Sequence, residues 1–177
     1  MAVSVTRAGF AIDLSANITS GTGARHSYAQ TLENDLKDGS GNFIFDRVFA
    51  LEAYSLTTAA GNFDIDLYDL GSLDVWGVGA GNDNLGLAHA NAKIHMIAIR
   101  NRVITSGGQL RIDNGIANAW TGVLPASATL DLPQGGVLLA QFGDTGATVT
   151  DASSHMLRLS AQTADCEIDV VFFSSQS

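Results

Sequence analysis

Short segments in which apolar and polar residues alternate follow one another from about Phe43 to the end of the sequence. Gly, Asn, Asp and Ser separate these segments, as they do where a chain turns. Residues 63–67, Phe-Asp-Ile-Asp-Leu, are the clearest example. Since successive residues of a strand belong to opposite faces, this segment has one buried face and one wet face. A long series of such strands is typical of a β-sandwich or barrel.

The alternation of apolar and polar residues predicts nine strands. Helical segments do not follow the strands in turn, as they do in a βαβ fold, which argues against a parallel nucleotide-binding sheet. An immunoglobulin-like sandwich uses about 100 residues and often carries a Cys-Trp-Cys pattern, which is absent. We therefore expect an all-β fold, an antiparallel β-sandwich of the jelly-roll type. The expected strands are 43–57, 62–69, 73–78, 93–101, 109–113, 127–132, 136–142, 155–161 and 166–173.

Residues 1–24 are predicted to be an N-terminal arm or an edge strand, and residues 25–177 a single sandwich domain. In the arm, Phe10, Ile12 and Leu14 alternate with smaller or polar residues and so share a face of a strand. A Gly-rich polar segment at 19–23 ends this pattern. Such an arm could pair with a neighbouring subunit.

Residues 26–38 are the one candidate helix. Tyr28, Leu32 and Leu36 are spaced by four, which would stack them on one face of a helix. The alternation of Tyr28, Gln30 and Leu32 also fits a strand.

The composition limits the partners that this chain can have. The formal net charge is −9 at pH 7 and the basic residues are scattered, so we expect no nucleic-acid partner. No apolar stretch approaches the ~20 residues of a membrane span, and no signal peptide is visible at the N-terminus. Charged residues make up only 15% of the chain, which suits a surface that is partly covered by other protein.

No pattern of catalytic or metal-binding residues is present, and we expect neither an enzyme nor a cofactor. The single cysteine, Cys166, lies on the apolar side of its strand and is predicted to be a small buried hydrophobe. There is no Gly-x-Ser-x-Gly nucleophile motif and no phosphate-binding loop. The histidines have no His-x-His spacing that would favour a metal site; they are His26, His89, His95 and His155.

An acidic cluster and two tryptophans have alternative interpretations. Asp64, Asp66, Asp69, Asp74 and Asp83 could bind Ca²⁺ at the end of a sandwich, but they do not follow the EF-hand spacing. The simpler interpretation makes Asp64 and Asp66 the wet face of a strand and has Asp69 open a turn with Gly71. Trp76 and Trp120 lie beside polar loops, where each could stack on a sugar, anchor an interface or close the end of a core.

The middle and C-terminal segments resemble the capsid decoration, or cement, proteins and head-fibre domains of tailed bacteriophages. The resemblance covers roughly two thirds of the chain and rests on a succession of segments rather than on a chemical motif. The segments are Leu67-Tyr-Asp-Leu-Gly71, Leu85-Gly-Leu, Lys93 to Asn101, Gly107 to Ile112, Trp120, Leu130 to Val137, Met156 to Ala161, and Asp165 to Phe173.

This resemblance implies a non-enzymatic structural protein of the virion. Such proteins often form trimers, lie on the outer surface of the capsid and bridge subunits of the major capsid protein. The interface residues that we expect are Phe10, Ile12, Leu14, Trp76 and Trp120. The alternative is a carbohydrate- or receptor-binding module of a phage fibre or tail, in which the two tryptophans and the Asp64–Asp83 cluster form the site.

Overall fold

The computed structural model describes residues 9–19, 25–35, 44–45, 47–71, 73–74, 80–82, 88, 90–102, 104 and 107–176. The chain divides into two compact units, Met1–Phe43 and Ile44–Ser177. The boundary between the units therefore lies about twenty residues after the expected one at residue 24. The cause is that residues 25–35 pair with the strand of the arm and so belong to the first unit.

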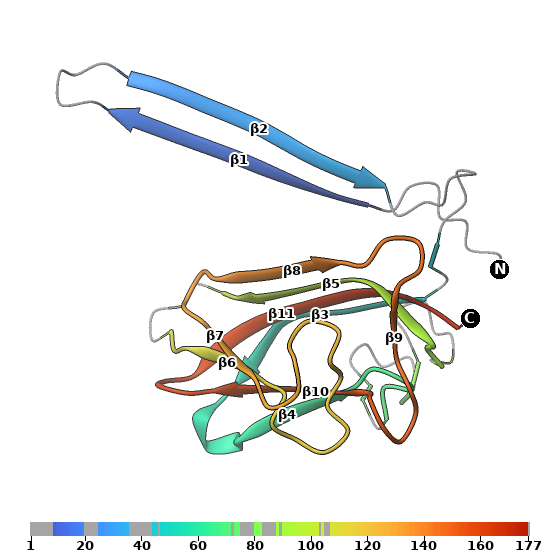
Figure 1. Cartoon of the computed structure of the whole chain (residues 1–177). Coiled ribbons are helices and arrows are strands. Elements are labelled where there is room, and N and C mark those ends of the chain that lie inside the picture. The colour runs from blue at the N-terminus through green and yellow to red at the C-terminus, as the bar shows by residue number, and fades with distance from the viewer. Residues whose placement is uncertain are drawn as a thin grey trace. The chain divides into compact units, whose positions relative to one another are not determined.

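The first unit is an antiparallel hairpin of β1 (Gly9–Thr19) and β2 (Arg25–Asp35) (Figure 1). The helix expected at 26–38 is therefore wrong for residues 26–35; residues 36–38 lie outside the described part. The spacing of four between Tyr28 and Leu32 is even, so it places both residues on one face of a strand as well as of a helix. Pairing with β1 supplies β2 with backbone hydrogen bonds over its whole length, which decides between the two.

The second unit is a β-sandwich of two antiparallel sheets. Its elements are β3 (Arg47–Leu56), the 3₁₀ turn η1 (Thr58–Ala60), β4 (Asn62–Asp66), β5 (Lys93–Asn101), β6 (Leu110–Asp113), β7 (Thr129–Leu132), β8 (Val137–Gln141), β9 (Ala147–Thr148), β10 (Met156–Ala161) and β11 (Cys166–Ser175). One sheet has the order β4-β10-β6-β7, and the five-stranded sheet has the order β3-β11-β5-β8 with β9 paired to β5 (Figure 1). The chain crosses between the sheets at almost every connection, which is the jelly-roll connectivity that the sequence predicts.

The expected strand 73–78 is not present in its described residues. Leu73 donates its backbone N–H to the carbonyl of Leu70 at 3.0 Å, and Leu70 and Gly71 have positive φ angles of 61° and 56°. This segment is a turn, and residues 75–78 lie outside the described part. The two-residue strand β9 was missed because so short a segment has no period to detect.

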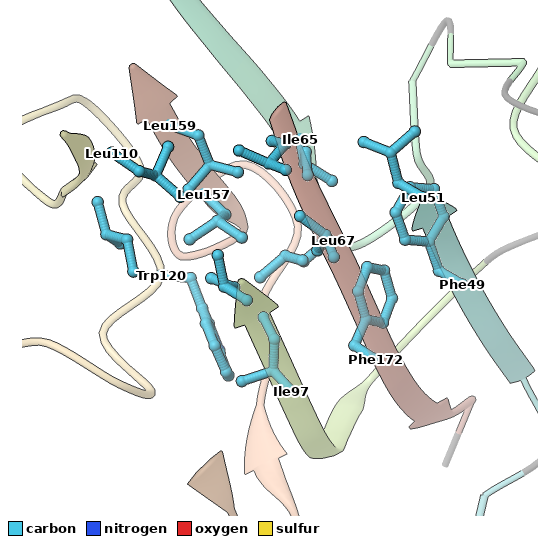
Figure 2. Close-up of a cluster of buried hydrophobic side chains, with 14 of the residues drawn as sticks. Phe49, Leu51, Ile65, Leu67, Ile97, Leu110, Trp120, Leu157, Leu159 and Phe172 are labelled. Atoms are coloured by element: carbon cyan, nitrogen blue, oxygen red, sulfur yellow. The ribbon is translucent and has the colours of Figure 1, made fainter. Parts of the chain in front are cut away.

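The facing sides of the two sheets form one hydrophobic core (Figure 2). Phe49 of β3 stacks on Phe172 of β11 with ring centroids 4.9 Å apart. Each large side chain of this core contributes about 1.5–3 kcal/mol through its burial, so the unit holds together without a disulfide. Other members are Leu51, Ile65, Leu67, Ile97, Leu110, Leu157 and Leu159. No helix within the described ranges is long and apolar enough to cross a membrane.

Candidate protein-interaction surfaces

The N-terminal hairpin has one unbroken register. Its residues pair from Gly9 with Asp35 to Thr19 with Arg25, without a bulge. Residues that are paired directly across two antiparallel strands belong to the same face, and successive pairs alternate between the two faces. The register therefore fixes which residues of β1 and β2 share a face.

The two faces of the hairpin differ sharply in chemistry. The face that we call the apolar hairpin face carries no charged residue; it consists of Phe10, Ile12, Leu14, Ala16, Ile18, His26, Tyr28, Gln30, Leu32 and Asn34. The polar hairpin face carries every charged residue of the two strands, namely Asp13, Arg25, Glu33 and Asp35, among small and hydroxyl-bearing residues. The hairpin is therefore an amphipathic two-stranded sheet.

A two-stranded sheet depends on packing against further layers for its stability. Among the strands that the structure describes, β1 and β2 pair only with each other. An isolated two-stranded hairpin is marginally stable at best in water, and a third strand or packing against another apolar layer normally supports it. The uncharged face is suited to supply that packing.

Three of the expected interface residues come together on this surface. Phe10, Ile12 and Leu14 are consecutive members of the apolar hairpin face. The sequence interpretation missed Tyr28 and Leu32, which belong to the same face, because it assigned them to a helix. The Gly-rich segment between two alternating runs, which is typical of a hairpin turn, is the signal that could have identified them.

The other two expected interface residues do not join this surface. Trp76 lies outside the described residues. The Trp120 side chain is 1% exposed, contacts Phe142 edge-on and donates its indole N–H to the Thr148 carbonyl at 2.9 Å. A side chain at Gly122 would collide with the Trp120 ring, so the glycine leaves room for it. Trp120 is a core residue, and it cannot stack on a sugar from this position.

The described acidic residues of the proposed Ca²⁺ or glycan cluster are held by bonds within the chain. Asp64 forms a two-pronged ion pair with Arg158, at 2.7 Å in both bonds. Asp66 accepts the backbone N–H of Tyr68 at 2.8 Å, and Asp69 accepts that of Gly71 at 2.7 Å, as the turn interpretation predicts. Asp83 lies outside the described residues.

The described histidines are also tied into the local structure. His95 is 2% exposed, with Nδ1 3.1 Å from the Gly143 carbonyl and Nε2 3.0 Å from Ser175 Oγ. Since a carbonyl only accepts, Nδ1 donates to it, and in the neutral ring Nε2 then accepts from the serine hydroxyl. His155 Nδ1 lies 3.0 Å from Asp66 Oδ2. The described ranges contain no group of three His, Cys, Asp or Glu residues that could hold a metal ion, while His89 and the His26 side chain lie outside them.

Cys166 is a buried hydrophobe, as its place in the alternation predicts. Its side chain is 1% exposed, and burial raises the pKa of the thiol above its ordinary value. A thiol with a raised pKa forms little thiolate, so it reacts slowly.

The outer face of the four-stranded sheet carries internal ion pairs. Arg158 pairs with Asp64 across β10 and β4, and Arg111 pairs with Asp131 across β6 and β7 at 2.7 and 2.8 Å. The hydrogen bonds from Arg111 lower the pKa of Asp131, and the bonds to Asp64 raise the pKa of Arg158. These charges already have partners, and each such exposed pair adds little stability.

The outer face of the five-stranded sheet is divided into an apolar and a charged part. Ala50, Val171, Ala98 and Leu139 form one row across the four main strands, and all four are half-buried. Farther along the sheet lies a cluster of acidic residues and arginines, in which Arg102 Nε is 3.1 Å from Glu167.

A β-bulge adjoins this charged part. Asp169 accepts the N–H of Ala53, a residue with φ 52°, at 2.9 Å, and lies 3.3 Å from Arg102. These groups hold the bulge together.

No protein-family model matches the chain, and no curated protein matches it significantly.

Proposed function

We propose that this chain is a non-enzymatic structural protein that acts by binding other protein subunits through the apolar face of its N-terminal hairpin. The observation that carries the proposal is the segregation of charge on the hairpin. One face has Phe10, Ile12 and Leu14 and no charged residue, while the other carries all the charges. A free amphipathic hairpin gains stability by burying its apolar face, so binding and ordering of the arm are coupled.

The resemblance to phage decoration proteins suggests the phage head as the assembly to which the hairpin face binds. We place the protein on the outer surface of a tailed-phage head, where it self-associates and binds the major capsid protein. A protein that binds only the assembled shell stabilises that state by mass action. A net charge of −9 is consistent with a position away from the packaged DNA.

The alternative, a glycan- or receptor-binding module, lacks a comparable observation. Trp120 is buried and Asp64 is paired with Arg158. We therefore develop only the structural role.

The test adds purified protein back to phage heads that were assembled in its absence, and measures the bound copies per major capsid subunit. The wild-type chain is expected to bind to saturation at a fixed ratio. Leu14→Asp places a charge on the apolar hairpin face, at a cost of about 3 kcal/mol or more if that face is buried. Occupancy should then require a roughly 100-fold higher concentration.

Ser15→Asp is the matched control, because it adds the same charge at the next residue, on the polar hairpin face. It should bind as the wild type does. Heads that take up no wild-type protein would refute the capsid assignment. Equal binding by Leu14→Asp and wild type would refute the role of the hairpin.

A further inference from the structure

We propose that the outer edge of β8, the side of this strand that faces away from β5, is a further protein-binding site. It takes an uncharged, extended segment of a partner protein as an added antiparallel strand. Neither the hairpin face nor a phage head takes part, so the site goes beyond the proposed function. Three observations carry it: the direction of the backbone groups of β8, the absence of charge on this strand and the apolar side chains beside its edge.

The hydrogen bonds between β5 and β8 fix which backbone groups of β8 point away from the sheet. The N–H of Phe142, directly after β8, donates to the His95 carbonyl at 2.8 Å. In an antiparallel pair, every second residue bonds to the neighbouring strand. Alternate residues counted back from Phe142 therefore bond to β5, whereas Val137 and Leu139 direct their N–H and C=O groups to the outer edge.

The outer edge of β8 has no strand beside it among the strands that the structure describes. β8 is an end strand of the five-stranded sheet and pairs only with β5. Backbone N–H and C=O groups are strong donors and acceptors, and an extended segment of another chain satisfies a row of them together. The edge therefore selects a peptide backbone as its ligand.

The other end strands of the two sheets carry charge, and β8 does not. Charged residues on edge strands keep further strands from pairing with them. The sequence of β8, Val-Leu-Leu-Ala-Gln, contains no charged residue and no proline, so a strand can pair with it without covering a charge. The charged residues of the other end strands are Arg47 and Glu52 in β3, Asp64 and Asp66 in β4, and Asp131 in β7.

Apolar side chains beside the edge define the chemistry of the partner strand. Val137 is 58% exposed, the largest fraction of any large apolar side chain in the described part of the chain. Leu139 ends the apolar row that crosses the outer face through Val171 and Ala98. Residues of an added strand that pair with Val137 and Leu139 belong to the same face and cover both side chains, so they are apolar.

Charge makes the partner segment a neutral one. The net charge of −9 repels an acidic segment, and β8 offers no acidic side chain to a basic one. An uncharged segment with apolar residues at alternate positions matches both the backbone and the side chains of the edge.

The probe for this site is the peptide acetyl-Thr-Val-Thr-Val-Thr-amide, titrated into the isotope-labelled full chain and followed by amide NMR. Its two valines are designed to pair with Val137 and Leu139. Concentrations up to about 5 mM suit the roughly millimolar affinity of so short a contact. The amides of Val137 and Leu139 should shift and exchange more slowly with solvent, while those in the middle of β11 should not change.

N-methylation supplies matched control peptides. In the antiparallel pair, the valines aim their N–H groups at β8 and the central threonine aims its N–H away from it. A methyl group on one valine nitrogen should weaken binding at least about 10-fold, because it removes a donor and adds bulk at the contact. A methyl group on the central threonine nitrogen should leave the affinity unchanged.

Proline substitutions test the same groups on the protein. Leu139→Pro removes the outward N–H and leaves the bonds between β8 and β5 in place, so it should weaken binding at least about 10-fold. Leu139→Ala keeps the N–H and should lose less. Thr129→Pro is the control for proline on an edge strand, and it should bind as the wild type does. The exposed Thr129 directs its N–H away from β6, because the neighbouring Ala128 accepts the N–H of Asn114.

Two results would overturn the inference. One is a titration that leaves the amides of Val137 and Leu139 unchanged, and the other is equal binding of the two methylated peptides. Light scattering tests the rival occupant, a second copy of this chain. An assembly of the free chain that dissociates in Leu139→Pro and persists in Thr129→Pro would show that β8 pairs with its own copy, and would overturn the assignment to a partner protein.

Discussion

At the scale of single residues, Trp120 shows how burial decides between a binding residue and a core residue. The Gly and Asn residues around Trp120 are compatible with both an exposed and a buried ring, so the sequence alone does not distinguish the two. The structure surrounds the ring with core residues and satisfies its N–H with the Thr148 carbonyl. Burial of a side chain is set by residues distant in sequence, which a local pattern does not contain.

We expect Trp120→Ala to lower the free energy of unfolding by about 3–5 kcal/mol, because it leaves a large cavity in the core. Trp120→Phe should cost less, since it keeps an aromatic ring and loses mainly the bond to Thr148, worth about 1 kcal/mol. Urea denaturation of the full chain measures both. Binding to phage heads should be unchanged in Trp120→Phe, and a loss of that binding in the folded variant would show that Trp120 contributes to an interface after all.

At the scale of strands, the sequence predicted the sandwich well and the hairpin in part. The strand expected at 93–101 is β5 as observed, because alternation and flanking turn residues agree there. β2 was assigned to a helix because Tyr28 and Leu32 fit both periods. Of the apolar hairpin face, the sequence predicted only Phe10, Ile12 and Leu14. The residues that β2 contributes depend on the register between the two strands, which the pattern of one strand does not contain.

Hydrogen exchange should show that the hairpin is stable only when another subunit covers its apolar face. In the wild-type protein bound to phage heads, the amides of β1 and β2 that bond across the hairpin should exchange slowly. In Leu14→Asp at the same concentration they should exchange at least about 100-fold faster, because an uncovered two-stranded sheet opens readily. The strands β5 and β11 provide the control within the same molecule, and they should be equally protected in both proteins. Slow exchange of β1 and β2 in unbound Leu14→Asp would contradict this dependence on a covering subunit.

At the scale of the whole molecule, net charge and the apolar hairpin face act in opposite directions on self-association. Each copy carries a formal charge of −9, so two copies repel each other as they approach. The apolar hairpin face contains no charged residue. Salt shortens the range of the repulsion, from about 10 Å at 0.1 M to about 3 Å at 1 M, and leaves an apolar contact in place.

Self-association should therefore become tighter as sodium chloride rises from about 0.05 to 0.5 M, a range over which the screening length shortens severalfold. Analytical ultracentrifugation at each salt concentration measures the dissociation constant of the assembly. Asp13→Asn combined with Glu33→Gln removes two charges from the polar hairpin face without changing the apolar hairpin face. This variant should associate more tightly than the wild type at low salt and should respond less to added salt. An assembly that salt weakens would instead be held by ion pairs, and the uncharged hairpin face could not be its interface.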